Sequence, residues 1–260
     1  MPPPPPGPLR LRHQAVIDAV VPARDEAPTV AAVVAALAAC RYVREVIVVD
    51  DGSADATAEV AAAAGAKVVE RRGARGAGSK ALAMQVGVAA SDADAVLFAD
   101  ADLLGATSAH FDDICRPYLE GRATMSLGLF DYGRWNALVL RFPPTTGQRL
   151  VPRWVFEAVP PAKRDGYLIE IMINEVVTEA RLPVVARTMA GVTHRTKRDK
   201  FGPREGRRRT WRMFWELMAL WGVCRWRTYW YYLRDLTIDP GPGRRPWRPG
   251  PPPAGGARGR

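Results

Sequence analysis

The sequence predicts an α/β fold in which helices cover both faces of a mostly parallel sheet, followed by an aromatic-rich helical segment near the C-terminus. Between residues 15 and 105, short apolar runs alternate with alanine-rich helical patterns, an order typical of parallel strands joined by helices. Several of these runs end directly in acidic residues, at the edge where such sheets bind ligands. A third observation is the cluster of tryptophan and tyrosine residues after residue 210.

The first part of the chain is predicted to form strands that alternate with helices, which implies a parallel sheet. Pro28 precedes the first predicted helix, and Gly65 ends the second. In order, the expected elements are a strand at Ala15–Val21, a helix at Thr29–Cys40, a strand at Glu45–Val49, a helix at Asp55–Ala64, a strand at Lys67–Glu70, a helix at Lys80–Ala90 and a strand at Ala95–Ala99.

The pattern changes after residue 105, where a turn-rich stretch around Pro143 and Pro144 separates two groups of elements. The expected elements are a helix at Ser108–Leu119, a strand at Thr124–Phe130, a helix at Tyr167–Arg181 and a strand at Val184–Met189 that ends near Gly191–His194. The last expected element, Trp211–Leu236, is either one long aromatic-rich helix or a pair of helices.

Composition places the chain among ordinary globular proteins. Its 260 residues are 48% hydrophobic and 25% charged, enough for one sizeable core with a small appended lobe. We find no apolar run of the roughly 18 residues that span a bilayer and no secretory signal, so we expect a cytoplasmic location. Cys40, Cys115 and Cys224 are far apart and fit neither a disulfide framework nor a metal-ligand spacing.

The net charge of +10 is concentrated in two segments. Residues 195–212 carry nine Lys and Arg side chains against two acids, and residues 241–260 carry five Arg and no acid. The remainder is slightly acidic, which argues against a core that binds nucleic acid. The basic segments favour a local anionic partner such as a phosphate, a membrane surface or RNA.

Asp100 and Asp102 follow the predicted strand at Ala95–Ala99 and are separated by one alanine. Two close carboxylates raise each other's pKa unless a cation lies between them. A hard divalent ion such as Mg²⁺ or Mn²⁺ satisfies this need and is often shared with a phosphate. The alternative is that Asp102 is a helix cap or first-turn acid preceding Leu103.

Acidic groups also end the first two predicted strands. Arg24, Asp25 and Glu26 stand where a dinucleotide-binding fold would carry its glycine-rich turn, so an NAD or FAD site is disfavoured. Asp50 and Asp51 would lie at the sheet edge, where a carboxylate can accept hydrogen bonds from a base or a ribose. A simple Asp-Gly turn with a cap for the next helix remains the alternative.

The glycine-rich stretch at residues 73–80 resembles a phosphate-binding Walker loop but fails its register, because Ser79 separates the last glycine from Lys80. The loop can still present backbone N–H groups, Arg75 and Lys80 to an anion at a helix N-terminus.

Two isolated residues complete the candidate site. Glu170 is flanked by large apolar residues, so we expect it to be functional or paired with an arginine, unless it lies on an exposed helix face. His194 ends a predicted strand and is either a structural histidine or a metal ligand, since imidazole suits Mn²⁺.

These motifs together resemble the GT-A fold nucleotide-sugar glycosyltransferases of the family 2 type. The resemblance rests on Val21-Pro22-Ala23-Arg24-Asp25-Glu26, then Val48-Val49-Asp50-Asp51-Gly52-Ser53, the loop with Lys80, and the Asp-x-Asp motif at Asp100 and Asp102. The stretches 166–171 and 191–195 are similar to the glucosyl-3-phosphoglycerate synthase branch, although Leu168 departs from its pattern.

The resemblance implies a role for each motif residue. It implies donor binding by Pro22, Ala23, Arg24, Glu26, Asp50, Asp51, Gly76, Lys80, Asp100 and Ala101. It implies Mg²⁺ or Mn²⁺ held by Asp102 and His194 together with Asp100, and catalytic roles for Glu170 and Asp102. It implies acceptor binding by Gly147, Gln148, Arg149 and Tyr167.

The same resemblance divides the chain. We expect a glycosyltransferase domain at 14–202, with a nucleotide-sugar half at 14–105 and an acceptor half at 106–202. It is flanked by a disordered proline-rich tail at 1–13, a basic, aromatic-rich helical segment at 203–239 and a disordered tail at 240–260. Within the helical segment, residues 207–236 could contact the inner face of a membrane, or they could pack on the sheet or in a homodimer.

The expected reaction is metal-dependent transfer of a hexose from a UDP- or GDP-sugar to a small phosphorylated acceptor such as 3-phosphoglycerate. Transfer to a polyprenyl phosphate at the membrane surface is an alternative that the aromatic segment would suit. A sugar nucleotidyltransferase would share the sheet and the carboxylate-bound metal, but its glycine-rich signature is missing after the first strand. A non-catalytic nucleotide-binding module is the third alternative.

Overall fold

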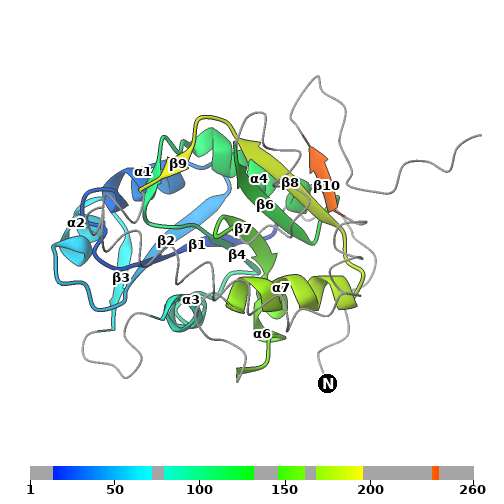
Figure 1. Ribbon diagram of the computed structural model, residues 1–260, viewed down its shortest axis with the longest axis horizontal. Coiled ribbons are helices and arrows are strands. Elements are labelled where there is room, and N and C mark those ends of the chain that lie inside the picture. Colours follow the sequence, from blue (N-terminus) through cyan, green and yellow to red (C-terminus); the bar gives the residue numbers. More distant parts are fainter. Residues whose placement is uncertain (1–13, 72–78, 132–145, 162–167, 196–235, 240–260) are drawn as a thin grey trace, which may run out of the picture.

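A computed structural model describes residues 14–71, 79–131, 146–161, 168–195 and 236–239 (Figure 1). The helices are α1 (Val30–Ala38), α2 (Thr57–Ala63), α3 (Lys80–Ala89), α4 (Ser108–Leu119), α6 (Arg153–Glu157) and α7 (Leu168–Glu179). The strands are β1 (Ile17–Ala23), β2 (Val43–Asp50), β3 (Lys67–Glu70), β4 (Ala95–Phe98), β5 (Leu103–Leu104), β6 (Met125–Phe130), β7 (Arg149–Pro152), β8 (Val184–Met189), β9 (Thr193–His194) and β10 (Leu236–Asp239).

The main sheet has eight strands in the order β10-β8-β6-β7-β4-β1-β2-β3. β7 runs antiparallel to both of its neighbours, and the other pairs are parallel. β5 and β9 form a separate antiparallel pair. The predicted α/β class with a mostly parallel sheet is therefore confirmed.

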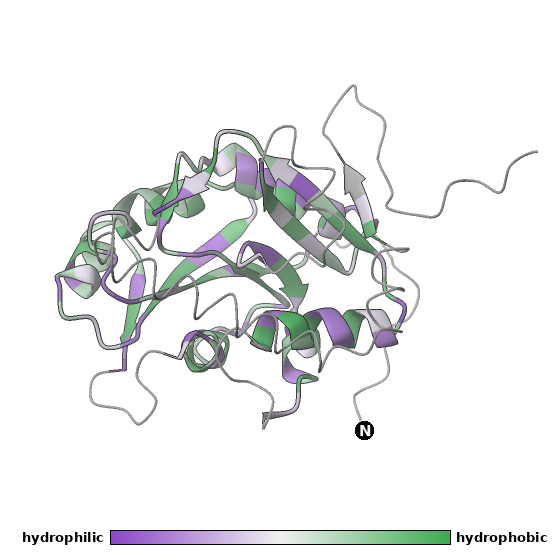
Figure 2. Cartoon of the chain, in the orientation of Figure 1, coloured by the Kyte–Doolittle hydropathy of each residue, from purple (hydrophilic) through white to green (hydrophobic). Residues whose placement is uncertain are grey.

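Two apolar layers cover the two faces of this sheet, which confirms the expected helices on both sides. Val21 and Leu97 face the layer that α1 and α4 complete, whereas Val20 and Val96 face the layer formed with α3, α6 and α7. Neighbouring residues enter opposite layers because side chains alternate along a strand. The two groups of helices lie above and below the sheet in Figure 1, and hydrophobic residues follow the central strands in Figure 2.

The strand β7 lies in the stretch that the sequence predicts to be turn-rich. It inserts between β4 and β6, with Arg149 opposite Phe98 on one side and Leu127 on the other. Four residues that begin with arginine and end with proline give no alternating apolar pattern, so the strand has no clear signal in the sequence. Its position is held by both neighbours rather than by local propensity.

The C-terminal segment is only partly described. Leu236–Asp239 form β10, which pairs in parallel with β8, so the prediction of a helical segment over 203–239 is wrong at its end. Leu-Thr-Ile is a β-prone sequence, and these residues pair with β8 instead of forming the expected helix. The tails at 1–13 and 240–260, residues 207–235 of the segment expected to contact a membrane or to pack on the sheet or in a dimer, Gly76 and Tyr167 lie outside the described residues. Within the described part of the chain, no helix has the length and apolarity to cross a membrane.

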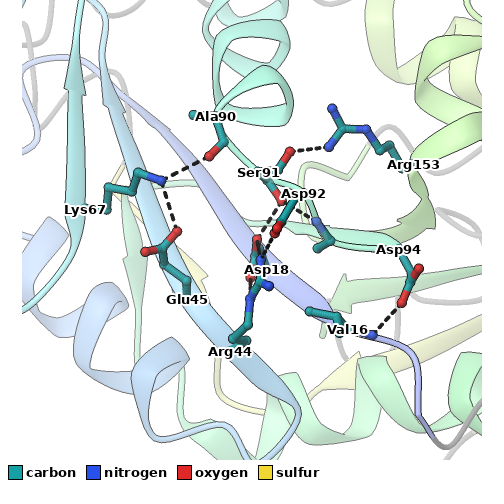
Figure 3. A network of polar contacts seen from close by, with 11 residues as sticks. Val16, Asp18, Arg44, Glu45, Lys67, Ala90, Ser91, Asp92, Asp94 and Arg153 are labelled. Carbon is teal, nitrogen blue, oxygen red and sulfur yellow. Dashed lines mark hydrogen bonds and ion pairs between the residues drawn. The ribbon is translucent and has the colours of Figure 1, made fainter.

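Figure 3 shows a polar network at the amino ends of the strands, opposite the edge where the acidic motifs lie. Asp18 of β1 is fully buried and accepts hydrogen bonds from Arg44 Nε and Nη2 at 2.9 and 2.7 Å. The Ser91 hydroxyl donates to the same carboxylate at 2.6 Å. Arg44 also pairs with Asp92, whose side chain is 86% exposed. The network joins β1 and β2 to the connection that leads from α3 into β4.

The two acidic partners of Arg44 provide a test of this network. Asp18→Ala is expected to lower Tm by more than about 5 °C, because it leaves the buried Ser91 hydroxyl and the half-exposed Arg44 without their shared acceptor. Asp92→Ala is the matched control and should change Tm by less than about 2 °C, since an exposed ion pair contributes little. Thermal unfolding followed by circular dichroism measures both, and equal shifts would contradict the structural role assigned to Asp18.

Candidate active site

The candidate active site lies where β1, β2 and β4 end side by side. β1 lies between the other two strands, with Ala23 opposite Asp50 of β2 and Val20 opposite Phe98 of β4. Pro22 and Ala23 therefore share one edge of the sheet with Asp50 and with the residues that follow β4. This pairing brings the motifs predicted for donor binding into one region.

At this edge, the Lys80 ammonium joins two carboxylates from distant parts of the chain. Lys80 Nζ lies 2.6 Å from Asp100 Oδ1 and 2.7 Å from Glu170 Oε1. Lys80 is the first residue of α3, and Glu170 lies in the first turn of α7. The two helices pack on the same face of the sheet (Figure 1). The lysine therefore fixes the distance between the end of β4 and the start of α7.

Burial and neighbouring charges have opposite effects on the pKa values of Lys80 and Asp100. Burial alone would disfavour the ammonium, but the carboxylates of Asp100 and Glu170 raise the pKa of Lys80 well above its usual range. Burial likewise disfavours ionised Asp100, yet Lys80, the amide of Gln148 and the charge of His194 lower the pKa of Asp100. Both groups are therefore charged at neutral pH.

The segment before β7 completes the environment of Asp100. Gln148 Nε2 donates to Asp100 Oδ2 at 2.8 Å, and the Thr146 hydroxyl donates to Gln148 Oε1 at 2.6 Å. Gly147 lies directly against the same carboxylate, and a Cβ there would overlap both of its oxygens. Both carboxylate oxygens of Asp100 thus accept from protein donors, which fixes the orientation of the group rather than leaving it free to rotate.

Asp102 lies next to His194 through the β5–β9 pair. Leu103 of β5 is opposite His194 of β9, and the Arg195 backbone N–H donates to the Asp102 carbonyl at 3.1 Å. The imidazole is exposed and lies against the Phe130 ring, with 5.2 Å between the ring centres. Because Leu103–Leu104 form a strand, the alternative of Asp102 as a helix cap is wrong.

These side chains fit a divalent ion that takes some of its ligands from elsewhere. A carboxylate and an exposed imidazole are suitable donors for Mn²⁺, and a carboxylate for Mg²⁺. Among the described residues, no three His, Cys, Asp or Glu side chains gather into a ready-made metal cage. An ion held by Asp102 and His194 would therefore complete its coordination with ligand oxygens and water.

At the same edge of the sheet, three further acidic side chains are held in place by other residues of the protein. Asp50 Oδ1 accepts from the Ser53 backbone N–H at 3.2 Å and from its hydroxyl, so the expected turn after β2 forms. Asp51 pairs with Arg71, both of them largely buried. Glu26 Oε2 lies 3.4 Å from Arg195 Nη1, which links the end of β1 to the residue after His194.

Of the other residues predicted for the site, some are exposed and some are buried. Arg24 is exposed, where its side chain lies 3.9 Å from Asp25, and Ala101 is buried beside the acidic pair. Arg149 is fully buried and donates to the Thr146 and Glu170 carbonyls and to Asn174. Direct contact of Arg149 with an acceptor stays a prediction, as do the individual roles of the other site residues.

The sequence analysis missed three residues that shape the site. Arg71 and Arg195 are single basic residues next to acidic motifs, and only pairing in space shows which acid each one contacts. Phe130 ends a predicted strand, but its contact with His194 depends on the β5–β9 pair. Glu170, expected to be functional or paired with an arginine unless it lay on an exposed helix face, is buried and pairs with Lys80.

Comparisons with known proteins agree with this geometry. The family described as "Glycosyl transferase family 2" matches residues 18–174. Among solved structures, glucosyl-3-phosphoglycerate synthase from Mycobacterium tuberculosis in complex with phosphoglyceric acid is 26% identical, with a TM-score of 0.61 over 71% of this chain and 74% of that one. The same enzyme with Mn²⁺, UDP-glucose and phosphoglyceric acid is 25% identical, with a TM-score of 0.60 over 71% and 73%. No curated protein matches the chain.

The family match covers more than half of the sequence, including β1 except its first residue, every strand from β2 to β7 and the first part of α7. It also covers Lys80, the acidic pair and Glu170. The resemblance noted in the motifs is therefore confirmed: the chain is a glycosyltransferase and belongs to glycosyl transferase family 2.

Proposed function

We propose that this chain transfers a hexose from a UDP- or GDP-sugar to a small phosphorylated acceptor such as 3-phosphoglycerate, with Mg²⁺ or Mn²⁺ bound. The observation that carries the proposal is the pair of contacts by which Lys80 joins the carboxylates of Asp100 and Glu170. The β5–β9 pair brings the segments of Asp102 and His194 together near this site. Such a site offers fixed charges and hydrogen-bond acceptors to a hydroxyl-rich sugar on one side and a metal site on the other. Similar solved structures are complexes with Mn²⁺, UDP-glucose and either phosphoglyceric acid or glycerol 3-phosphate.

In this proposal, the donor lies across the carboxyl ends of β1, β2 and β4. The nucleotide occupies the side of Pro22, Ala23, Glu26, Asp50 and Asp51, where carboxylates and backbone groups can accept from a base and a ribose. The sugar lies toward Lys80, Asp100 and Glu170. Arg24, Ala101 and Gly76 border the donor, the last from outside the described residues.

Asp102 and His194 are the proposed metal ligands, with Asp100 beside them. When bound, the ion supplies positive charge to the diphosphate that leaves the sugar. Since both oxygens of Asp100 already accept from Lys80 and Gln148, we assign that carboxylate mainly to the donor sugar. His194 is exposed, and its contact with the Phe130 ring restricts the rotation of the imidazole.

Glu170 acts at the transferred sugar. Its side chain is 3% exposed and forms an ion pair with Lys80, so in this proposal it accepts a hydroxyl proton or stabilises positive charge that develops at the reacting carbon. Lys80 holds this carboxylate in place and balances its charge. Gly147 and Gln148, with Tyr167 outside the described residues, are the proposed contacts of the acceptor.

Two other acceptors or reactions remain as outcomes of the test. A polyprenyl phosphate would require residues 207–236 to approach a membrane, and a nucleotidyltransferase would release pyrophosphate instead of a nucleoside diphosphate. We propose a small acceptor, and with it a cytoplasmic reaction, because complexes of the similar synthase contain phosphoglyceric acid or glycerol 3-phosphate.

A transfer assay tests the proposal directly. Purified chain is incubated with UDP-glucose or GDP-glucose, 3-phosphoglycerate and Mn²⁺, and the products are separated by anion-exchange chromatography. We expect a glucosylated phosphoglycerate and an equal amount of nucleoside diphosphate, and none of either when the metal is chelated. Release of pyrophosphate, or binding of the nucleotide with no product from any acceptor offered, would contradict the proposal.

Replacement of Asp102 tests the metal site. Asp102→Ala is expected to lower the transfer rate at least about 100-fold and to remove the gain in UDP affinity that Mn²⁺ gives, because a direct ligand is lost. Isothermal titration calorimetry of UDP with and without Mn²⁺ measures the second effect independently of turnover. Asp113→Ala, on the surface of α4, is the control that should behave as wild type. Unchanged Mn²⁺-assisted UDP binding in Asp102→Ala would refute the assignment.

The close contact between Gly147 and Asp100 gives a further prediction. Gly147→Ala is expected to lower the transfer rate more than about tenfold, because the new methyl group displaces Asp100 from Gln148 or Lys80. Gly65→Ala is the control: its φ of +94° strains an alanine, but no atom lies within 4 Å of the added carbon. That variant should lose stability and retain its rate. Full activity of Gly147→Ala would show that the contact has no influence on the site.

A further inference from the structure

Arg149 is a buried cation in the middle of the main sheet. It lies in β7 between Phe98 of β4 and Leu127 of β6, and its side chain has no exposed surface. Phe98 and Leu127 belong to the apolar layer beneath α7. An arginine in such a layer is costly to bury unless its donors are satisfied, so its hydrogen bonds indicate what it holds in place.

The guanidinium group of Arg149 joins two segments that border the site. Nε and Nη2 donate to the Thr146 carbonyl at 3.0 and 2.6 Å. Nη1 donates to the Glu170 carbonyl at 2.9 Å and to Asn174 Oδ1 at 3.2 Å. One side chain therefore fixes the main chain before Gly147 and the main chain of Glu170 at the same time.

These contacts close a ring around the site. Gln148 binds Asp100, Asp100 binds Lys80, and Lys80 binds the Glu170 side chain. The Glu170 carbonyl returns to Arg149, which is joined to Gln148 by a peptide bond. We propose that Arg149 is a positioning residue that holds Glu170 toward Lys80 and the donor sugar; this role rests on the proposed transfer reaction and differs from the acceptor contact expected from the sequence.

Charge supports the same role. Asp100 and Glu170 contribute two negative charges to the ring, and Lys80 and Arg149 contribute two positive ones. A lysine could not replace the arginine fully, because only a guanidinium can donate in several directions from one rigid plane to the Thr146 and Glu170 carbonyls together. Arg149 therefore combines charge balance with a fixed geometry.

Variants of Arg149 test the proposal in the full-length chain. Arg149→Met keeps the length of the side chain and removes its donors, and Arg149→Lys keeps the charge with fewer donors. We expect kcat with UDP-glucose and 3-phosphoglycerate to fall about tenfold or more in Arg149→Met and less in Arg149→Lys, because Glu170 shifts from the reacting sugar. The affinity for UDP with Mn²⁺, measured by calorimetry, should change less than about threefold, because the nucleotide contacts lie elsewhere.

Arg153→Met is the matched control, since Arg153 lies in the same β7–α6 segment but binds Glu157 and the Ser91 carbonyl. It should keep the wild-type kcat. Hydrogen exchange provides a readout that does not need turnover: Arg149→Met should increase exchange in residues 146–150 and 168–174 together, and leave β1 and β2 unchanged. If Arg149→Met does not fold, Arg149→Lys carries both measurements.

The outcomes separate this proposal from the proposed reaction. A folded Arg149→Met or Arg149→Lys variant with wild-type kcat, or one that loses UDP affinity as strongly as kcat, would overturn the positioning role. Wild-type protein that binds UDP and Mn²⁺ but transfers no sugar would instead overturn the proposed reaction. In that case, the exchange experiment still decides whether Arg149 couples the two segments, and unchanged exchange in 168–174 would reject the coupling.

Discussion

The candidate site depends on one shared cation, the Lys80 ammonium between Asp100 and Glu170. The ammonium pairs with one carboxylate that follows β4 and with another in the first turn of α7, two groups that would otherwise repel each other in a partly buried space. Through these two ion pairs, α3, the end of β4 and α7 are held at fixed separations. A charged site whose geometry is set before the ligand arrives can stabilise charge in a reaction without reorganising.

The antiparallel strand β7 and the residue before it hold Asp100 and Glu170 in this arrangement. Its first residue and the residue before it point to opposite faces of the sheet, and each fixes one of the two carboxylate-bearing segments: Gln148 holds Asp100, and Arg149 holds the main chain of Glu170. Gly147 provides the close approach that this requires. The nucleotide side of the edge is built differently, from turns and ion pairs such as Asp51–Arg71 and Glu26–Arg195. The donor and reacting halves of the site therefore have separate supports.

Much of this could be predicted from the sequence because it follows from local patterns. Apolar runs that end in acids gave β1, β2 and β4 with Asp50 and Asp100 at one edge, and the glycine-rich loop placed Lys80 at a helix start. The rest depends on contacts between distant segments. β7 shows no apolar alternation, β10 is a short strand after an aromatic segment, and the partner of Glu170 comes from ninety residues upstream. Arg149 is the clearest case, because an arginine next to a predicted ligand loop is normally expected to be exposed.

A crystal structure of the chain with Mn²⁺ and UDP tests the central claim most directly. The account predicts that Lys80 remains within hydrogen-bonding distance of both Asp100 and Glu170, and that the ion is bound by Asp102, His194 and diphosphate oxygens. A lysine that contacts neither carboxylate, or an ion bound far from His194, would contradict it.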